Sequence, residues 1–363
     1  MNKTGFGFLR LPRTEDGGIN YATLFPVVDR FFELGGSYID TAYTYLNGQS
    51  EEAVRKSIVE RYPRDRFILA DKLPGYQVKR YEDCEELFQE QLKRCGVDYF
   101  DVYMLHWLNA ENYAIAEKHD EFRFLRELKA QGRAKQIGFS FHDSAALLDR
   151  ILTAHPEIDL VLLQINYLDW ESPSIQSRLC YETAVRHGKQ VVVMEPVKGG
   201  SLANLPEEAD ALLHSLRPEE SSASWAIRFV TSLTEVCTVL SGMNSEAQML
   251  DNMRDLDPLT PEETEILAQC AAIIRSKTAV ACTGCSYCVP HCPKHIPIPR
   301  FFSLYNDYHR TPAEDWKIRP VYNELAAHAK ASDCIECRRC EKNCPQKLPI
   351  TTYLKELAKV FEA

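Results

Sequence analysis

Two runs of closely spaced cysteines lie near the C-terminal end of the chain. Residues 282–293 and residues 334–345 both follow the pattern Cys-x2-Cys-x2-Cys-x3-Cys-Pro. Structural zinc sites combine two Cys-x2-Cys halves and have no use for a third cysteine at the same step. Disulfides are rare in reducing compartments. The spacing therefore favours another kind of metal centre, with zinc sites and disulfides as the weaker alternatives.

The repeated pattern resembles the cysteine run of bacterial ferredoxins that hold two [4Fe–4S] clusters. In those proteins the fourth cysteine of each run binds the cluster of the other run. The resemblance implies one ligand set of Cys282, Cys285, Cys288 and Cys344, and a second of Cys334, Cys337, Cys340 and Cys292. The 41 residues between Cys292 and Cys334 are typical of the helical ferredoxin modules attached to larger reductases. We expect a helix over Asn323–Ala331 and aromatic residues at 301–308 that dock this module on the rest of the protein.

A second set of reactive side chains follows three β-like segments. Asp40 and Tyr45 follow the second segment, Lys72 ends the third, and His106 ends the fourth. Hydride reduction of a carbonyl leaves an alkoxide, which tyrosine can protonate. A neighbouring lysine favours the phenolate and makes the phenol a stronger acid, while an aspartate keeps the lysine charged. Histidine can orient the carbonyl oxygen, so we interpret these four residues as a catalytic set for carbonyl reduction.

These side chains need elements that end at a common rim. Eight β-like runs alternate with amphipathic helical stretches such as Glu82–Cys95 and Phe122–Gln131. The runs are Gly5–Pro12, Ser37–Ala42, Phe67–Leu73, Val102–Trp107, Gln136–Phe141, Leu160–Tyr167, Gln190–Pro196 and Glu235–Gly242. Eight such units in about 275 residues predict a (β/α)8 TIM barrel, whose chemistry lies at the C-terminal ends of the strands. A doubly wound open sheet is the alternative, although no Gly-x-Gly-x-x-Gly follows the first run.

Cysteine distribution predicts where the barrel ends. Eight of the 13 cysteines fall in the last 82 residues. We expect two domains: the barrel over residues 1–275, and a small, mostly helical ferredoxin-like domain with two [4Fe–4S] clusters over residues 276–363. The remaining cysteines are interpreted as small core residues: Cys84, Cys95, Cys180, Cys237 and Cys270.

The barrel segment resembles the aldo/keto reductase family over about residues 3 to 255. The motifs that carry this resemblance are Gly5–Pro12, Asp40–Tyr45, Asn47–Glu51, Lys72, Asp98–His106, Gly132–Ser140, Gln164–Tyr167 and Gly242–Asn252. The resemblance implies that Asp40, Tyr45, Lys72 and His106 form the catalytic tetrad. It also implies a nicotinamide cofactor, NAD(P)H, bound without a Rossmann fold.

The implied cofactor contacts depart from the family pattern at several positions. The residues that the resemblance assigns are Ser140, Gln164, Met194, Gln248 and Asn252. Separately, the backbone amides of Lys198, Gly199 and Gly200 after the seventh run could cradle the cofactor pyrophosphate, where barrels commonly bind phosphate; a glycine turn at a helix start is the alternative. Phe141 stands where the family has an asparagine, and Met194 stands where it has an aromatic ring on the nicotinamide. Gly242 and Gln248 replace two cations that grip a 2′-phosphate. These departures leave NAD and NADP equally open.

Composition narrows the function class. The net charge is −10, which argues against nucleic acid as the main partner. No apolar run approaches the roughly 20 residues that span a bilayer, and Met1–Gly18 has no apolar signal segment, so we expect a cytoplasmic protein. The hydrophobic fraction of 45% is that of a globular chain.

Three functions remain open at this stage. The first is NAD(P)H-dependent reduction of a small carbonyl compound, or the reverse alcohol oxidation, with Tyr45 as general acid or base. The second is a redox enzyme supplied with single electrons through the clusters by a partner protein, with a flavin or the substrate in the barrel mouth. The third is a redox-sensing regulatory subunit, since a fold alone does not guarantee catalysis.

Overall fold

The structure is a computed structural model that describes residues 3–255, 257–310 and 312–362. The chain divides into two compact units. The first contains the residues up to Pro196 together with Ala223–Leu259, and the second contains Val197–Ser222 together with the residues from Thr260 onward. The segment that follows the seventh strand therefore packs with the C-terminal part of the chain. The domain boundary at Ser276 stays a prediction.

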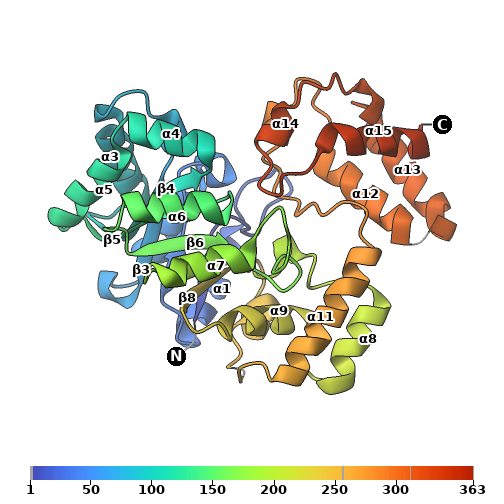
Figure 1. Cartoon of the computed structure of the whole chain (residues 1–363), viewed down its shortest axis with the longest axis horizontal. Helices are drawn as coiled ribbons and strands as arrows, with labels where there is room; N and C mark the ends of the chain where they lie inside the picture. Colours follow the sequence, from blue (N-terminus) through green and yellow to red (C-terminus); the bar gives the residue numbers. More distant parts are fainter. Residues whose placement is uncertain (1–2, 256, 311, 363) are drawn as a thin grey trace. The chain divides into compact units, whose positions relative to one another are not determined.

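The first unit is a closed barrel of eight parallel strands in chain order (Figure 1). The strands are β1 (Thr4–Gly7), β2 (Tyr38–Asp40), β3 (Ile68–Leu73), β4 (Phe100–Leu108), β5 (Ala134–Phe141), β6 (Leu160–Gln164), β7 (Gln190–Met194) and β8 (Val236–Ser241). Pairing of Gly5 on β1 with Leu240 on β8 closes the barrel. The predicted barrel is confirmed, and the open doubly wound sheet is excluded.

Helices follow the strands and cover the barrel. They are α1 (Tyr21–Glu33), α2 (Ser50–Val54), α3 (Glu82–Cys95), α4 (Ala110–Lys118), α5 (Glu121–Ala130), α6 (Ala145–Ala154), α7 (Ser177–Arg186), α9 (Ser222–Thr231) and α10 (Glu246–Asn252). Helix α3 shows why they form: Cys84, Phe88, Leu92 and Cys95 recur every three or four residues and are all buried. One face of the helix is therefore apolar and packs inward.

The inside of the barrel is filled with apolar side chains. Alternate residues of the strands point inward, as in other small barrels. The cluster they form contains Tyr38, Ala70, Val102, Met104, Leu160, Leu162, Val192 and Leu240. Gly138 on β5 has no room for a side chain, since a Cβ there would lie 2.5 Å from the Leu160 carbonyl oxygen. A filled interior leaves the ends of the strands for chemistry.

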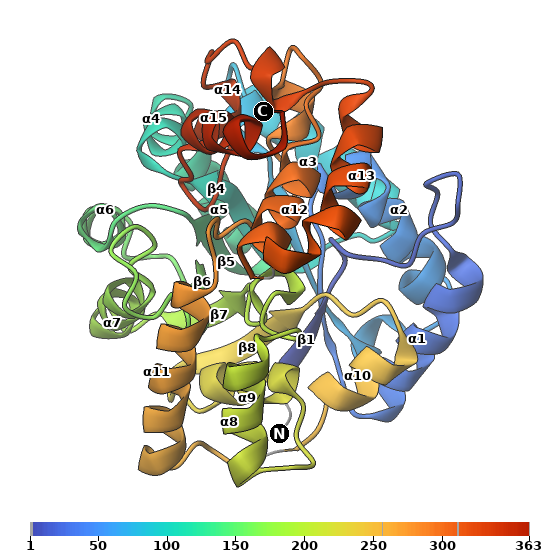
Figure 2. The same cartoon turned by 90° about the vertical axis from the view of Figure 1, so that its right-hand side faces the viewer.

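The second unit is helical. Helices α8 (Glu207–Leu216) and α11 (Pro261–Ser276) contact each other and lie side by side in Figure 1. Helix α12 (Ile298–Arg310) contacts both α13 (Asp315–Ala326) and α15 (Ile350–Phe361), as Figure 2 shows, and the short α14 (Arg339–Lys342) precedes α15.

Two expectations for this unit need correction. Phe301, Phe302 and Tyr305 are buried in the unit's own hydrophobic core, where Phe301 packs against Tyr322 at a ring distance of 4.8 Å. They stabilise the unit itself and are not a docking surface. A helix was predicted over 323–331, but the helix in this region is α13, which begins at Asp315 and ends at Ala326.

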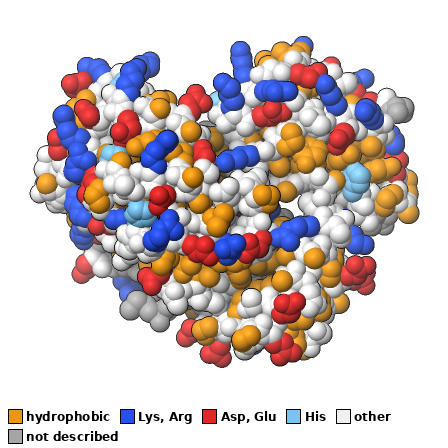
Figure 3. Space-filling view, viewed as in Figure 1, with side chains coloured by type: hydrophobic (Ala, Val, Ile, Leu, Met, Phe, Trp, Pro, Cys, Tyr) orange, Lys and Arg blue, Asp and Glu red, His pale blue; other side chains and the backbone are white. Residues whose placement is uncertain are grey.

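The surface view in Figure 3 shows basic and acidic side chains interspersed on the face turned to the viewer. Within residues 3–255, 257–310 and 312–362, no helix is both long and apolar enough to cross a membrane.

Candidate active site and cluster sites

Three neighbouring strands of the first unit carry the predicted catalytic residues. Asp40 is the last residue of β2, Lys72 lies in β3, and His106 lies in β4. Tyr45 begins a short helical turn just after β2. Parallel pairing aligns Asp40 with Ala70 and Lys72 with Met104. The same register therefore holds these segments at the C-terminal ends of their strands.

Lys72 and Asp40 form a fully buried ion pair. The Nζ atom of Lys72 lies 2.8 Å from both carboxylate oxygens of Asp40, and it also donates to the Thr41 carbonyl oxygen at 2.7 Å. The exposed fractions of the two side chains are 0% and 3%. Burial outweighs the opposing effect of the Lys72 ammonium, so the pKa of Asp40 is raised above its ordinary value. The pair places a charged lysine in the interior with its three donors occupied.

Tyr45 and His106 lie next to this pair. The Lys72 Nζ is 4.8 Å from the centre of the Tyr45 ring, and the His106 ring is 5.8 Å from the Tyr45 ring in an edge-on arrangement. Burial and then the charge of Asp40 raise the pKa of Tyr45 well above its ordinary value. This direction is opposite to the acidification by Lys72 expected from the sequence, because burial of the phenol dominates and the charge of Asp40 adds to it. Tyr45 is therefore a neutral phenol, which is the form that donates a proton.

His106 is a neutral imidazole. Burial and then the Lys72 charge lower the pKa of His106 well below its ordinary value. Its Nδ1 atom is buried and has no hydrogen-bond partner among the residues that the structure describes. Tyr76 lies 6.2 Å from the His106 ring and 6.2 Å from Trp107, so an aromatic wall borders the histidine. A buried ring nitrogen of this kind can hydrogen-bond a bound ligand.

A buried polar network behind β3 was not anticipated. Gln91 on α3 donates to the Lys72 carbonyl oxygen at 3.0 Å, and Asp71 accepts from the Lys72 amide at 2.7 Å. Glu51 is paired with Arg94 at 3.0 Å, and burial followed by the charge of Glu51 raises the pKa of Asp71 well above its ordinary value. These groups fix the β3 backbone at Lys72. The polar residues of α3 that interrupt its apolar face were the only sequence signal.

The expected cofactor contacts of the first unit are engaged within the protein. Ser140 accepts from the Trp107 amide at 2.7 Å, and Gln164 donates to Asp169 at 2.8 Å. Gln248 accepts from the Asn244 amide at 2.9 Å. The Asn252 side chain donates to Ser241 at 2.8 Å, and Met194 ends β7 against the interior cluster. These residues lie at or next to the ends of β5, β6 and β7, or on α10.

The glycine turn after β7 lies elsewhere. Lys198, Gly199 and Gly200 belong to the second unit. Lys198 is buried there, and its Nζ donates to the Gln346 side-chain oxygen at 3.3 Å. The structure therefore groups this turn with the C-terminal cysteine runs and not with the unit that carries the tetrad.

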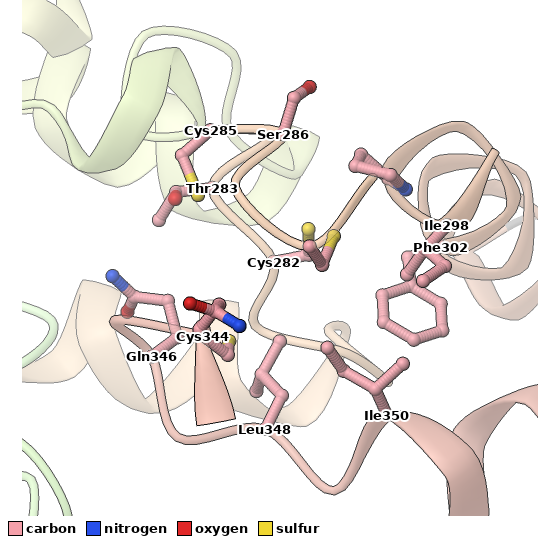
Figure 4. Close-up of a pocket in the computed structure, with 13 residues that line it drawn as sticks. Cys282, Thr283, Cys285, Ser286, Ile298, Phe302, Cys344, Gln346, Leu348 and Ile350 are labelled. Atoms are coloured by element: carbon pink, nitrogen blue, oxygen red, sulfur yellow. The ribbon is translucent and has the colours of Figure 1, made fainter. Parts of the chain in front are cut away.

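Cys282, Cys285, Cys288 and Cys344 line a single pocket of the second unit (Figure 4). The fourth residue comes from the other cysteine run, as the ferredoxin resemblance implied. The Gly284 amide donates to the Cys282 sulfur at 3.4 Å. Burial and the neighbouring thiols raise the pKa of Cys288. Ile298, Phe302 and Leu348 complete an apolar wall, so the donor set suits a cluster shielded from water.

The second set of cysteines is held close enough to interact electrostatically. After burial, the charges of Cys292 and Cys337 raise the pKa of Cys334. Burial, with added effects of Cys334 and Cys292, raises the pKa of Cys340 to about 11. Cys337 is exposed, whereas Cys340 is buried. Cys292 belongs to the other run, and the assignment of these four cysteines to one cluster stays a prediction.

The described part of the chain contains no three His, Cys, Asp or Glu side chains that converge tightly enough to hold one metal ion. Nor does any of its 13 cysteines form a disulfide. Cys282, Cys285, Cys288 and Cys344 are instead spread around one pocket. A cluster needs this spread because each thiolate binds a different iron.

The barrel with a buried Asp–Lys pair beside tyrosine and histidine, joined to a cysteine-rich helical unit, defines an iron–sulfur oxidoreductase. The chain belongs to the aldo/keto reductase family, whose model matches residues 3–272. A 4Fe-4S dicluster domain matches residues 281–349.

Relatives and solved structures agree with this assignment. Aldo-keto reductase YhdN of Bacillus subtilis is 31% identical over 146 residues, which is 38% of this chain and 43% of YhdN. Methylglyoxal reductase DkgB of Salmonella typhimurium is 27% identical over 54% of this chain and 70% of DkgB. The aldo-keto reductase AKR11C1 from Bacillus halodurans is 25% identical, with a TM-score of 0.60 over 74% of this chain and 91% of that structure. The match to YhdN thus covers less than half of that protein's length.

Proposed function

We propose that the protein reduces a small carbonyl compound with NAD(P)H, with Tyr45 as the proton donor. The observation that carries the proposal is the buried Lys72–Asp40 pair beside Tyr45. A neutral phenol, a neutral imidazole and a fixed ammonium group supply a donor, an orienting group and a positive field. The relative DkgB is a methylglyoxal reductase, which supports a small carbonyl substrate.

The chain's own residues would act as follows. Bound NAD(P)H would supply a hydride to the carbonyl carbon. Tyr45 gives its O–H proton to the carbonyl oxygen as the C=O double bond is lost, so that an alcohol forms. The phenolate that remains lies beside the Lys72 ammonium, which stabilises it. The neutral imidazole of His106 hydrogen-bonds and orients the oxygen, and reprotonation of Tyr45 from solvent completes the cycle.

The proposed cofactor contacts are Ser140, Gln164, Met194, Gln248 and Asn252. A ligand that used Ser140 or Gln164 would share these groups with Trp107 and Asp169, which they already contact. Gly242 and Gln248 provide no cation for a 2′-phosphate, so binding of NADH and NADPH should be compared directly.

The Tyr45→Phe variant tests the carbonyl chemistry. Loss of a general acid lowers the rate by about 100-fold or more, so we expect kcat for carbonyl reduction to fall by that factor. Tyr43→Phe is the matched control, because Tyr43 lies two residues away and donates to Glu90 at 3.1 Å. Iron content and nicotinamide affinity should match the wild type in both variants. Undiminished turnover by Tyr45→Phe would rule out this role.

A second function is favoured by the second unit. Lys198, Gly199 and Gly200 lie with the cysteine runs, and the other cofactor contacts have internal partners. The clusters would supply single electrons, with a flavin or the substrate itself in the barrel mouth. Anaerobic titration distinguishes the two functions. Bleaching of the iron–sulfur absorption by a low-potential donor but not by NADH or NADPH, with no nicotinamide binding, would favour this one.

The proposed cluster ligands are the two crossed sets, Cys282, Cys285, Cys288 and Cys344, and Cys334, Cys337, Cys340 and Cys292. The proposed division of labour places carbonyl chemistry in residues 1–275 and the clusters in residues 276–363. We further propose an electron-transfer partner protein at the exposed residues 335–339, and a reducing cytoplasm as the compartment. Ile335 is 59% exposed and the Arg338 side chain is 73% exposed, on either side of the exposed Cys337.

A further inference from the structure

The turn after β7 brings a cation into the iron–sulfur unit. Residues from Val197 to Ser222 pack with the C-terminal part of the chain although they follow a barrel strand in sequence. Lys198 is 3% exposed in the whole chain, and its Nζ contacts Gln346 of that unit. Burial of a lysine is rare because its charge loses hydration. The position of Lys198 therefore calls for a role in the second unit.

The backbone holds Lys198 in an unusual conformation. Lys198 has a φ of 47°, in the left-handed region that glycine favours, and Gly199 and Gly200 follow with φ values of 66° and 98°. Ser201 donates to the Lys198 carbonyl oxygen at 2.8 Å. A non-glycine residue in this region is strained and persists where the surrounding structure enforces it. The turn thus fixes the start of the lysine side chain.

The end of that side chain contacts the wall of the cluster pocket. Lys198 Nζ lies 3.3 Å from the side-chain oxygen of Gln346. Gln346 is 6% exposed and lines the same pocket as Cys282, Cys285, Cys288 and Cys344. Figure 4 shows Gln346 beside Cys344 on one side of this pocket. Lys198 therefore lies one side chain away from a cluster held by these four cysteines.

A cation in this position favours reduction of the cluster. Reduction adds one negative charge, and an ammonium group screened from water attracts that charge more strongly than an exposed one. Net charge, hydrogen bonds and exposure are the factors that set the potentials of such clusters. Gln346 keeps the ammonium group oriented towards the pocket wall.

We propose that Lys198 is part of the site of the cluster bound by Cys282, Cys285, Cys288 and Cys344, where it raises the reduction potential of that cluster. The turn after β7 would thus tune electron transfer instead of binding a cofactor pyrophosphate. This inference rests on the proposed ligand set and is independent of the proposed carbonyl chemistry.

The test is an anaerobic redox titration of the purified full-length protein with both clusters present, followed by electron paramagnetic resonance. Lys198→Gln should lower the reduction equilibrium constant of one cluster about tenfold, which is about 59 mV for a one-electron couple. The reduction equilibrium constant of the other cluster should change by less than twofold. Lys198→Arg keeps the charge and should leave the reduction equilibrium constants of both clusters within twofold of the wild type.

Lys347→Gln is the matched control. Lys347 is adjacent to Gln346 in sequence but is exposed, so water and salt screen its charge. The inference is overturned if Lys198→Gln leaves the reduction equilibrium constants of both clusters within twofold of the wild type. It is also overturned if Lys347→Gln changes these constants as much as Lys198→Gln does. Should Lys198→Gln fail to retain iron, Gln346→Glu decides. The added carboxylate should lower the reduction equilibrium constant of the same cluster about tenfold, and an unchanged constant overturns the inference. Loss of the Tyr45 role would leave these potentials unaffected, so the two failures are distinguishable.

Discussion

At the scale of single residues, burial and neighbouring charges set the state of the candidate active site. Lys72 is held by Asp40 and the Thr41 carbonyl oxygen, so its ammonium group is fixed in place before any substrate binds. Burial and the Asp40 charge then keep Tyr45 protonated, and burial keeps His106 neutral. Both groups therefore suit the proposed reduction of a carbonyl, which consumes a proton.

Glu121 is a buried carboxyl whose titration should govern stability. Its exposed fraction is 1%, and burial raises its pKa to about 8 from the ordinary 4.5. The folded protein therefore keeps this proton up to about pH 8, whereas the unfolded chain releases it near pH 4.5. The free energy of unfolding should fall as pH rises between these values, by an upper limit of roughly 4–5 kcal/mol.

Glu121→Gln should abolish most of this pH dependence. The neutral amide has no proton to lose, so the variant should be more stable than the wild type at pH 8 by about 1–4 kcal/mol. Anaerobic urea unfolding at pH 5, 6.5 and 8 measures the difference. Glu111→Gln, at an exposed position in the first turn of α4, is the control. A wild type and a Glu121→Gln variant with parallel pH profiles would contradict the argument.

At the scale of elements, helix α11 depends on its first turn. The Thr260 hydroxyl accepts from the Glu263 amide at 3.2 Å, and the Glu263 carboxylate accepts from the Thr260 amide at 2.8 Å. Arg217 also donates to Glu263 and ties the end of α8 to this cap. The cap therefore stabilises α11 and its contact with α8 together.

Thr260→Ala should weaken this helix pair. Loss of a threonine N-cap costs about 1 kcal/mol, so amide hydrogens in the first turns of α11 should exchange about fivefold faster. Thr260→Ser retains the oxygen and should exchange at the wild-type rate. Exchange measured by mass spectrometry separates these cases. Equal protection in all three proteins would show that the cap is not needed.

The elements also show what the sequence could and could not predict. Helix α3 was predicted with its observed ends, because its apolar residues recur every three or four positions along its whole length. Strand β1 was predicted to reach Pro12 but ends at Gly7, since apolar residues in a loop resemble those in a strand. Residue types at strand ends predicted four residues that the structure brings together, and their catalytic role stays a prediction. The placement of Lys198 was not predictable, because it depends on a segment that leaves the barrel to pack with distant residues.

At the scale of the whole molecule, each unit has its own hydrophobic core. The barrel core contains residues of β2, β3, β4, β6, β7 and β8, and the second core contains residues of α12, α13 and α15 with Cys288 and Cys340. Two of the eight proposed ligands therefore lie inside the second core, whereas Cys337 is exposed. This asymmetry gives the second cluster site the edge nearer to solvent.

That exposed edge is basic. Arg338, Arg339 and Lys342 are exposed around Cys337, and Glu336 is paired with Lys355 at 2.7 Å. The segment from Ser276 onward carries 13 Lys and Arg against 9 Asp and Glu, although the whole chain has a net charge of −10. Charge complementarity steers association, so this edge should favour an acidic one-electron carrier.

The double variant Arg338→Glu/Arg339→Glu tests this prediction. Steering contributes about tenfold or more to association rates and falls with salt. We therefore expect the rate constant for reduction by an acidic, reduced flavodoxin to fall about tenfold at low ionic strength and to lose its decrease with salt. Lys317→Glu/Lys359→Glu, exposed cations on α13 and α15, makes the same charge change away from the edge and should retain the wild-type rate. Reduction by the small cation radical of methyl viologen should not slow in either variant, because the clusters themselves are unchanged. Equal losses in both double variants would mean that overall charge, and not this edge, controls the encounter.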